Sequence, residues 1–216
     1  MKILLDTIDL EKIEDYYKSG IIVGVTTNPT LAKRFGMADD VDMINKIRKV
    51  MPAGEIHVEA FGDSVEEIIN NAERIFNKTK DEDLVFKVPF NKAGVTAVKK
   101  LKEKNFKTNL HLIFSINQAL LASVVNTDYI CPLMGRLDDI GHDAFKNLDT
   151  IKNSYKNSSV ETKIMASSIR HPRHVQRAFE VGADVITVPV NVLEKIFYHP
   201  LTNTGYEQFK KDIEST

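Results

Sequence analysis

A lysine lies inside an apolar run of the chain, and its position suggests carbonyl chemistry. The run covers residues 84–89, and Lys87 is its only charged residue. If the run forms a strand, its two-residue period places Lys87 on the same face as Val85, pointing into the protein. Loss of hydration there disfavours the ammonium form, lowers the lysine pKa and supplies the neutral amine that attacks a carbonyl to form an imine. The alternative is a structural ion pair with Glu59 or Asp6.

Six further polar residues lie at or near the ends of segments that we predict to be strands. The carboxyl ends of parallel strands share one rim, and barrel enzymes build their active sites there. A single polar residue at such a position is as readily explained as a helix cap or a loop anchor. A set of six on one rim favours a functional site, and its members are Asp6, Asn28, Glu59, Asn109, Arg136 and Ser168.

Carboxylates and arginines in this set match the needs of an imine-forming site. Formation and dehydration of the carbinolamine and cleavage of a carbon–carbon bond each move a proton, for which Asp6 and Glu59 are the candidates. Arg136 and Arg170 carry planar guanidinium groups suited to a phosphate or a similar anion. The alternative for the two arginines is surface pairing with the aspartates that follow Arg136 in the sequence.

The elements that must position these side chains are short runs rich in β-branched residues, alternating with longer charged segments typical of helices. This alternation predicts an α/β fold with a parallel sheet. Eight units spaced by roughly 20–30 residues favour a single-domain (β/α)8 TIM barrel over residues 1–216. A doubly wound sheet is the alternative, but the first βα turn lacks a GxGxxG fingerprint. The predicted strands are Lys2–Asp6, Gly24–Asn28, Glu55–Phe61, Leu84–Pro89, Thr108–Phe114, Tyr129–Gly135, Lys163–Ser168 and Asp184–Pro189.

The end of the chain follows a different pattern, because no strand separates its last two predicted helices. One helix is predicted to begin at Asn191 and another to lie around Tyr206–Ile213, within a helical tail of about residues 200–216. We expect this tail to be a subunit contact.

Composition excludes several classes of function. The chain has 216 residues and a formal net charge of −1, with basic and acidic residues interleaved, which argues against a nucleic-acid partner. No 18 apolar residues run together and the first apolar run is too short for a signal peptide, so we expect a cytoplasmic protein with no membrane contact. The single cysteine, Cys131, excludes an intrachain disulfide, and the six histidines show no convincing metal-ligand spacing.

Seven segments together resemble the small transaldolase family, and they span essentially the full chain. The most specific are the Thr-Thr-Asn-Pro-Thr motif and the lysine strand. The segments are Leu5-Asp-Thr, Gly24-Val-Thr-Thr-Asn-Pro-Thr, Val85-Phe-Lys-Val-Pro, Thr108-Asn-Leu, Gly135-Arg-Leu-Asp-Asp-Ile, Ala166-Ser-Ser-Ile-Arg and His199-Pro-Leu-Thr.

The resemblance implies a class I mechanism that needs neither metal nor cofactor. A lysine attacks the ketone of a ketose phosphate, an aldose phosphate leaves, and a dihydroxyacetone unit stays on the lysine as an enamine. Lys87 would be the nucleophile, Asp6 the acid/base for cleavage, and Glu59 would act with a bound water on the imine. The remaining implied site residues are Thr27, Asn28 and Asn109 at the substrate hydroxyls, and Arg136, Ser168 and Arg170 at the phosphate.

The chain also departs from the family pattern at three site positions. Glu59 is the residue of true transaldolases, whereas the related fructose-6-phosphate aldolases carry glutamine there. The family pattern expects threonine, serine and an aromatic residue where this chain has His111, Cys131 and Leu133. His111 shares the inward face of its strand with Asn109. Its imidazole could hold a water molecule or take up a proton itself. The alternative is that it only fills space and donates a hydrogen bond to a carboxylate. We interpret Cys131 as a serine-like filler, since no activating base is evident.

These departures lead to the hypothesis that His111 and Leu133 alter the choice of substrate, with 6-sulfofructose as a variant donor. The competing functions are an aldolase that releases dihydroxyacetone, a silent barrel that binds a sugar phosphate, and a metal-dependent aldolase. The resemblance further implies carbohydrate metabolism of the pentose phosphate type. It also implies a ring-like homo-oligomer, a pentamer or decamer, in which the terminal helix reaches a neighbour.

Overall fold

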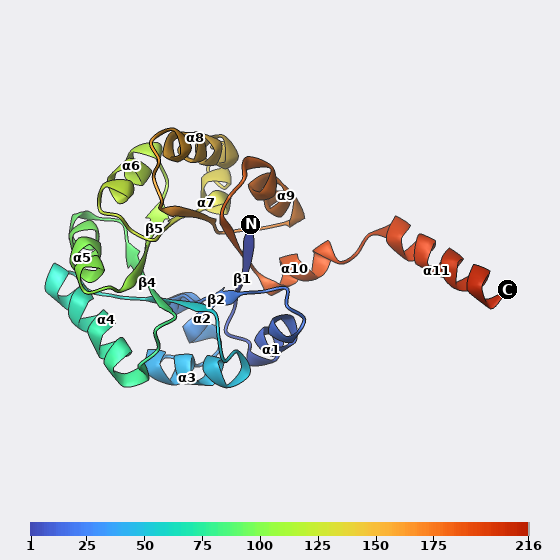
Figure 1. The fold of residues 1–216 in the computed structure, drawn as a ribbon, viewed down its shortest axis with the longest axis horizontal. Helices are drawn as coiled ribbons and strands as arrows, with labels where there is room; N and C mark the ends of the chain where they lie inside the picture. The colour runs from blue at the N-terminus through green and yellow to red at the C-terminus, as the bar shows by residue number, and fades with distance from the viewer. Residues whose placement is uncertain (216) are drawn as a thin grey trace.

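The computed structural model describes residues 1–215 and contains a closed barrel of parallel strands, which confirms the predicted α/β TIM barrel. The strands follow chain order, and the first pairs with the last to close the sheet. Figure 1 shows most of the helices arranged around the outside of this ring. The strands are β1 (Lys2–Asp6), β2 (Gly24–Thr26), β3 (Glu55–Glu59), β4 (Leu84–Pro89), β5 (Lys107–Ile113), β6 (Tyr129–Pro132), β7 (Lys163–Ala166) and β8 (Val185–Val188).

Most of the helices cover the outer face of the sheet, and the last helix does not. Most begin at a residue whose side chain accepts a hydrogen bond from the first helical turn; Ser64, for example, forms a full capping box with Glu67. The helices are α1 (Leu10–Lys18), α2 (Pro29–Arg34), α3 (Asp40–Val50), α4 (Val65–Thr79), α5 (Lys92–Glu103), α6 (Ile116–Val124), α7 (Met134–Asp138), α8 (Ala144–Asn157), α9 (Pro172–Val181), α10 (Val190–Ile196) and α11 (Pro200–Glu214).

Several strands end earlier than predicted, because the residues after them begin helices. The second strand stops at Thr26, and the Asn28 side chain accepts a hydrogen bond of 2.9 Å from the Leu31 amide at the start of α2. The sixth strand stops at Pro132, since Leu133 precedes the short helix α7. The rim residues therefore lie on strand-to-helix turns, where side chains can reach the barrel mouth.

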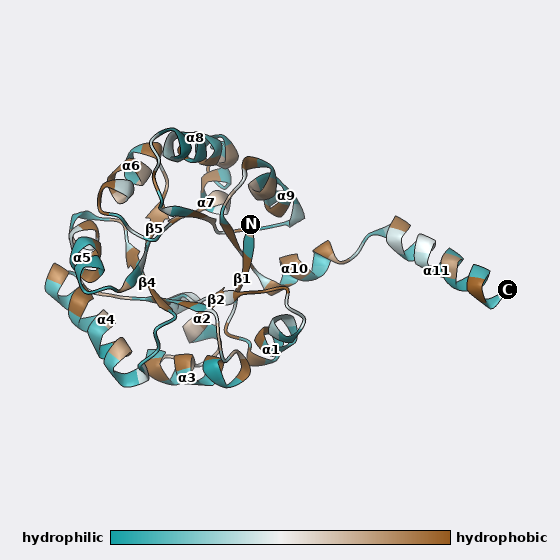
Figure 2. Cartoon of the chain, viewed as in Figure 1, coloured by the Kyte–Doolittle hydropathy of each residue, from teal (hydrophilic) through white to brown (hydrophobic). Residues whose placement is uncertain are grey.

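The alternation along β4 is the one predicted. Phe86 and Val88 pack in the core between the sheet and the helices, whereas Val85 belongs to a separate cluster inside the barrel. In Figure 2, β4 is drawn largely in the brown of hydrophobic residues. Lys87 therefore points into the barrel, above a layer of packed side chains.

A polar network lies within that interior. The Tyr129 hydroxyl is 2.8 and 2.9 Å from the two carboxylate oxygens of Glu55, and the His57 Nε2 is 3.5 Å from the same carboxylate. His57 is fully buried, and its Nδ1 is 3.1 Å from the Asn109 amide nitrogen. The network thus connects β3 and β6 to β5, which is the strand next to that of Lys87.

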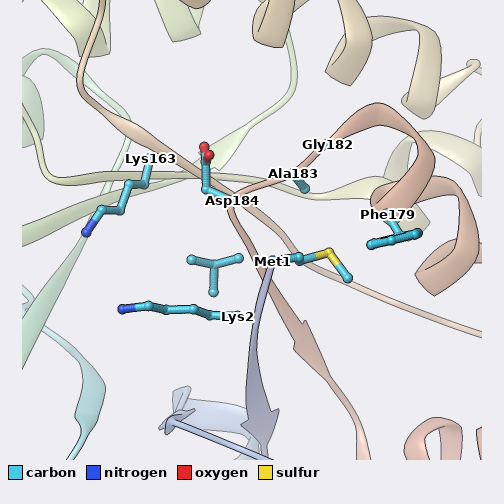
Figure 3. Close-up of a pocket in the computed structure, with 8 residues that line it drawn as sticks. Met1, Lys2, Lys163, Phe179, Gly182, Ala183 and Asp184 are labelled. Carbon is cyan, nitrogen blue, oxygen red and sulfur yellow. The ribbon is translucent and has the colours of Figure 1, made fainter.

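The amino-terminal end of the barrel carries a hollow of about 320 Å³. Figure 3 shows the Lys2 and Lys163 side chains on one side of it, and Met1 and Phe179 on the other. Lys2 and Lys163 are the first residues of β1 and β7, Met1 precedes β1, and Phe179 lies on α9. Barrel enzymes place their chemistry at the opposite end, so we assign this hollow no part in the site.

The last helix, α11, extends away from the barrel (Figure 1). It begins at Pro200, six residues before the predicted Tyr206, because proline fits the first helical turn and His199 caps the Leu201 amide. Tyr206, Phe209 and Ile213 recur at helical spacing and are all exposed. The helix thus presents an apolar face that no element within residues 1–215 covers.

Candidate active site

A cavity of about 410 Å³ opens at the carboxyl ends of the strands. Every strand, or the turn that follows it, contributes at least one lining residue, so the predicted convergence on one rim is present. The lining polar and ionisable side chains are Asp6, Thr26, Asn28, Thr30, Glu59, Lys87, His111, Cys131, Arg136, Ser167, Ser168, Arg170 and Thr187.

Lys87 lies on the wall of this cavity and is 7% exposed. Its Nζ donates a hydrogen bond of 2.8 Å to the backbone carbonyl of Thr27 and lies 2.9 Å from Glu59 Oε2. The register pairs Glu59 on β3 with Lys87 on β4, which brings the two side chains together. The ion pair considered from the sequence is therefore present, and it lies at the cavity rather than within a closed core.

Glu59 joins Lys87 to His111. Its Oε1 contacts His111 Nε2, while its Oε2 faces the lysine. Burial acts to raise the pKa of Glu59, but the charge of Lys87 and the contact with His111 outweigh it and hold the pKa below its usual value. Glu59 is thus an ionised carboxylate inside a largely buried cluster.

The pKa of Asp6 is shifted in the opposite direction to that of Glu59. Burial raises its pKa, although Lys87 and a hydrogen bond of 2.9 Å from Thr26 Oγ1 oppose that effect. The Thr26 hydroxyl lies 2.5 Å from that of Thr187 on β8, which fixes it toward the carboxyl group. Two carboxyl groups whose surroundings move their pKa values in opposite directions are suited to different steps of acid–base chemistry.

Sequence reasoning did not single out Thr26 and Thr187. The signal was available for both, because Thr26 lies in the Thr-Thr-Asn-Pro-Thr motif and Thr187 alternates with the inward-facing Val185. A lone threonine in a β-branched run resembles ordinary strand composition, which hid them.

Two residues at the rim have left-handed backbone conformations. Leu112 has φ 59° at a bulge in the β5–β6 pairing, and Ser168 has φ 57° after β7. The bulge places His111 and Leu112, which are consecutive, on the same cavity. A branched residue in this region of φ costs free energy, and such strain concentrates at functional sites.

The two arginines flank the cavity mouth. Arg136 is exposed on α7, and Arg170 forms a 2.9 Å ion pair with Asp139. Gly135 lets α7 approach the turn after β7, since a Cβ there would lie 2.3 Å from the Ser168 carbonyl oxygen. The close approach brings Arg136, Ser168 and Arg170 to one side of the cavity.

Two predicted site residues lie elsewhere. Asn109 was predicted at or near the end of its strand, but it is the third residue of β5. Its side chain is fully buried and contacts His57. The Thr27 hydroxyl donates to the His57 carbonyl oxygen at 3.0 Å, and only the Thr27 backbone faces Lys87. Neither residue lines the cavity. Their contact with substrate stays a prediction.

Cys131 and Leu133 both line the cavity. Burial raises the pKa of the Cys131 thiol to about 11, which leaves it protonated and a poor nucleophile near neutral pH. This agrees with its interpretation as a small filler. Leu133, which directly follows the strand next to His111, adds an apolar wall.

Comparison with known proteins decides the family. The family described as Transaldolase/Fructose-6-phosphate aldolase matches residues 3–216. The chain belongs to this family. It is 38% identical to a probable transaldolase of Methanococcus maripaludis over 215 residues, covering 100% of this chain and 98% of the relative. A probable transaldolase of Geobacillus is 40% identical, with 98% of each chain covered. One of Dehalococcoides mccartyi is 36% identical, with 100% and 99% covered.

Solved structures support the fold alone. A thiamine phosphate pyrophosphorylase from Pyrococcus furiosus aligns with a TM-score of 0.59 at 14% identity, covering 87% of this chain and 85% of that one. A mandelate oxidase variant aligns with a TM-score of 0.58 at 12% identity, covering 87% and 64%. These identities are too low to carry function from a shared barrel.

Two further observations concern the described residues of this transaldolase/aldolase family member. Within residues 1–215, no three or more histidine, cysteine, aspartate or glutamate side chains are grouped so that they could hold a metal ion. No helix in the same part of the chain has both the length and the apolar character needed to cross a membrane.

Proposed function

We propose that the protein is a transaldolase that forms a Schiff base through Lys87 and transfers a dihydroxyacetone unit from a ketose phosphate to an aldose phosphate. The donor is of the fructose 6-phosphate or sedoheptulose 7-phosphate type. The observation that carries the proposal is a lysine at the wall of the rim cavity, close to an ionised carboxylate and on the same cavity as a second carboxyl group of raised pKa. Family membership supports the same reaction class.

The geometry suggests a division of labour between the carboxyl groups. Glu59 lies against the lysine nitrogen and is ionised, so it is suited to move protons while the imine forms and hydrolyses. Asp6 lies across the cavity with its pKa raised, so it is suited to take the hydroxyl proton of the donor as the carbon–carbon bond breaks. It would return that proton when the enamine attacks the acceptor aldehyde.

The far end of the cavity is suited to the phosphate. Arg136 and Arg170 supply positive charge, and Ser168 supplies a hydroxyl, on the side away from β3 and β4. We infer that a phosphate placed there orients the sugar chain toward Lys87. Arg170 would exchange its surface pair with Asp139 for the ligand.

The distinction between transfer and release is tested by product analysis. With fructose 6-phosphate and erythrose 4-phosphate, a transaldolase produces sedoheptulose 7-phosphate and little dihydroxyacetone. With donor alone it stalls at the enamine, because no acceptor removes the three-carbon unit. Steady release of dihydroxyacetone without acceptor would instead establish the fructose-6-phosphate aldolase reading. Repeating the assay with 6-sulfofructose as donor tests the influence of His111 and Leu133.

We further propose a homo-oligomer of the ring type, with α11 packed against a neighbouring copy. The support is the exposed apolar face of α11 and the extension of this helix away from its own barrel (Figure 2). We also propose that the protein works in the cytoplasm in carbohydrate metabolism of the pentose phosphate type, since its proposed substrates are sugar phosphates.

Truncation after His199 should lower the assembly mass and leave the barrel folded, because the α11 side chains are exposed on the single chain. Phe209→Glu should have the same effect by placing a charge on the apolar face. Lys211→Glu, on the opposite side of the helix, is the matched control. Light scattering and circular dichroism provide the readouts. An unchanged mass for both the truncation and Phe209→Glu would contradict the proposed packing.

A further inference from the structure

His111 lines the cavity beside Glu59, the carboxylate partner of Lys87. On β5 it is the register partner of Pro89 on β4 and of Cys131 on β6. Its Nε2 contacts one oxygen of Glu59, whose other oxygen is 2.9 Å from Lys87 Nζ. A single carboxylate therefore connects the imidazole to the lysine nitrogen.

The geometry of these contacts leaves hydrogen-bonding capacity unused. His111 Nε2 and Glu59 Oε2 are both buried, and neither contact has the angles of a hydrogen bond. Buried polar atoms in a structural core are normally satisfied by protein partners. Both atoms are in close contact with an ionisable partner, and Glu59, Lys87 and His111 all line the cavity, so the three side chains are placed to exchange protons with a molecule that enters it.

Charged and titratable groups face His111 from several elements. Burial lowers the imidazole pKa, and the charges of Lys87 and Arg136 lower it further, whereas Glu59 raises it. The neighbouring thiol of Cys131 stays neutral because burial raises its pKa to about 11. Asp6 lines the far side of the same cavity. The imidazole is thus neither locked in its charged form nor isolated from proton donors.

We propose that His111, acting with Glu59, carries protons between the nitrogen of Lys87 and the oxygen that leaves during imine formation. The proposal rests on the proposed Schiff-base function and adds a residue to it. It also gives a physical role to a histidine at a position where the family pattern has threonine.

The proton accounting requires two transfers. A protonated lysine amine gives one proton to the Glu59–His111 pair, and the neutral amine then forms the carbon–nitrogen bond with the ketone. The nitrogen gives up a second proton, and the former carbonyl oxygen takes one to become the carbinolamine hydroxyl. The carbon–oxygen bond then breaks as the nitrogen lone pair forms the C=N bond, and the hydroxyl takes the other proton and leaves as water. The pair ends with the protons that it held at the start.

Two proton sites suit this sequence better than one. Glu59 alone accepts a single proton, and the positive charge beside it disfavours keeping that proton. The imidazole of His111 adds a second site, and its lowered pKa keeps it in the neutral, proton-accepting form at the start of the reaction. His111 therefore extends the capacity of the carboxylate during formation and hydrolysis of the imine.

The test replaces His111 with glutamine or asparagine, which keep polar contact with Glu59 but cannot titrate. The rate of imine formation is measured by quenching with borohydride at increasing times, and steady-state kinetics are recorded across pH 5 to 9. We expect kcat to fall about 100-fold, within the usual range for loss of an acid–base group, with KM changed less than about threefold. The wild-type rate should fall as the pH drops through the imidazole pKa, because a protonated imidazole cannot accept a proton, and this fall should disappear in the variants. His142→Gln, at an exposed histidine outside the cavity, is the control.

The outcomes separate this inference from the function on which it rests. Suppose that borohydride labels wild-type Lys87, and that a folded His111 variant keeps the wild-type kcat and the wild-type pH profile. That result overturns the role of His111 and leaves the Schiff-base function intact. A change in KM without a change in the pH profile also overturns it, because that is what a packing role produces. If wild-type Lys87 is not labelled at all, the Schiff-base function fails and this inference fails with it. Use of two variants guards against misfolding of one, and circular dichroism identifies the folded ones.

Discussion

Replacing Lys87 with methionine should reduce kcat/KM by at least roughly 10⁴-fold, in the range seen when a covalent nucleophile is removed from other enzymes. Methionine fills a similar volume but has no amine to form the carbon–nitrogen bond. It also leaves Glu59 without its cationic neighbour, and an uncompensated buried charge costs about 3–5 kcal/mol. Loss of activity and loss of stability must therefore be separated.

Lys87→Arg provides that separation. Arginine keeps a positive charge beside Glu59 and a donor for the Thr27 carbonyl oxygen, yet its guanidinium stays protonated and cannot serve as the nucleophile. We expect the same loss of activity with a smaller change in the free energy of unfolding, measured by urea denaturation. Retention of more than about a hundredth of the wild-type rate by either folded variant would contradict nucleophilic catalysis by Lys87.

Asp6→Asn should divide the reaction into two halves. The amide still accepts the hydrogen bond from Thr26 but cannot take the donor's hydroxyl proton, so cleavage of the carbon–carbon bond should slow by roughly 10²–10⁴-fold. Imine formation depends on Lys87 and Glu59, so borohydride should still label Lys87 in the presence of donor. The measurements are the rate of aldose phosphate release and the extent of labelling.

The role of Asp6 also predicts how the cleavage rate of the wild-type protein depends on pH. Burial raises the pKa of Asp6, and the cleavage step requires its ionised form, so the acid limb of the rate should lie above the ordinary aspartate range. Asp9→Asn is the matched control, because Asp9 caps α1 and asparagine caps helices equally well. Equal loss of labelling and of cleavage in Asp6→Asn would assign Asp6 to imine formation instead.

The direction of Lys87 and the closure of the barrel followed from short-range patterns. A two-residue period fixes which face a side chain occupies, and eight alternating units leave few ways to bury both faces of a parallel sheet. The same reasoning correctly brought Asp6, Glu59 and Arg136 to one rim. These features depend on local periodicity, which a sequence displays directly.

Other features depend on how strands align with one another. Asn109 was expected at a strand end, but β5 continues four residues beyond it, and its side chain contacts His57 below the cavity. The bulge at Leu112 and the contact between His111 and Glu59 arise from the pairing of β5 with its neighbours. A single sequence carries no direct signal of strand register, so these contacts required the structure.

The departures from the family pattern now have distinct physical meanings. Cys131 is a buried, protonated thiol that fills space, whereas His111 contacts the carboxylate beside the lysine. Leu133 forms an apolar wall of the same cavity. The substrate hypothesis from the sequence thus separates into two parts: His111 concerns proton transfer, and Leu133 concerns the fit of the sugar chain.

The most direct test of the central claim is reduction of the protein with borohydride in the presence of fructose 6-phosphate, followed by peptide mass analysis. The account predicts one modified lysine, Lys87, carrying a reduced three-carbon unit, and no modification when donor is omitted. Addition of erythrose 4-phosphate before the reductant should decrease this label, since the acceptor removes the unit. A label on another lysine, or none on Lys87 while the protein turns over donor, would contradict the Schiff-base mechanism.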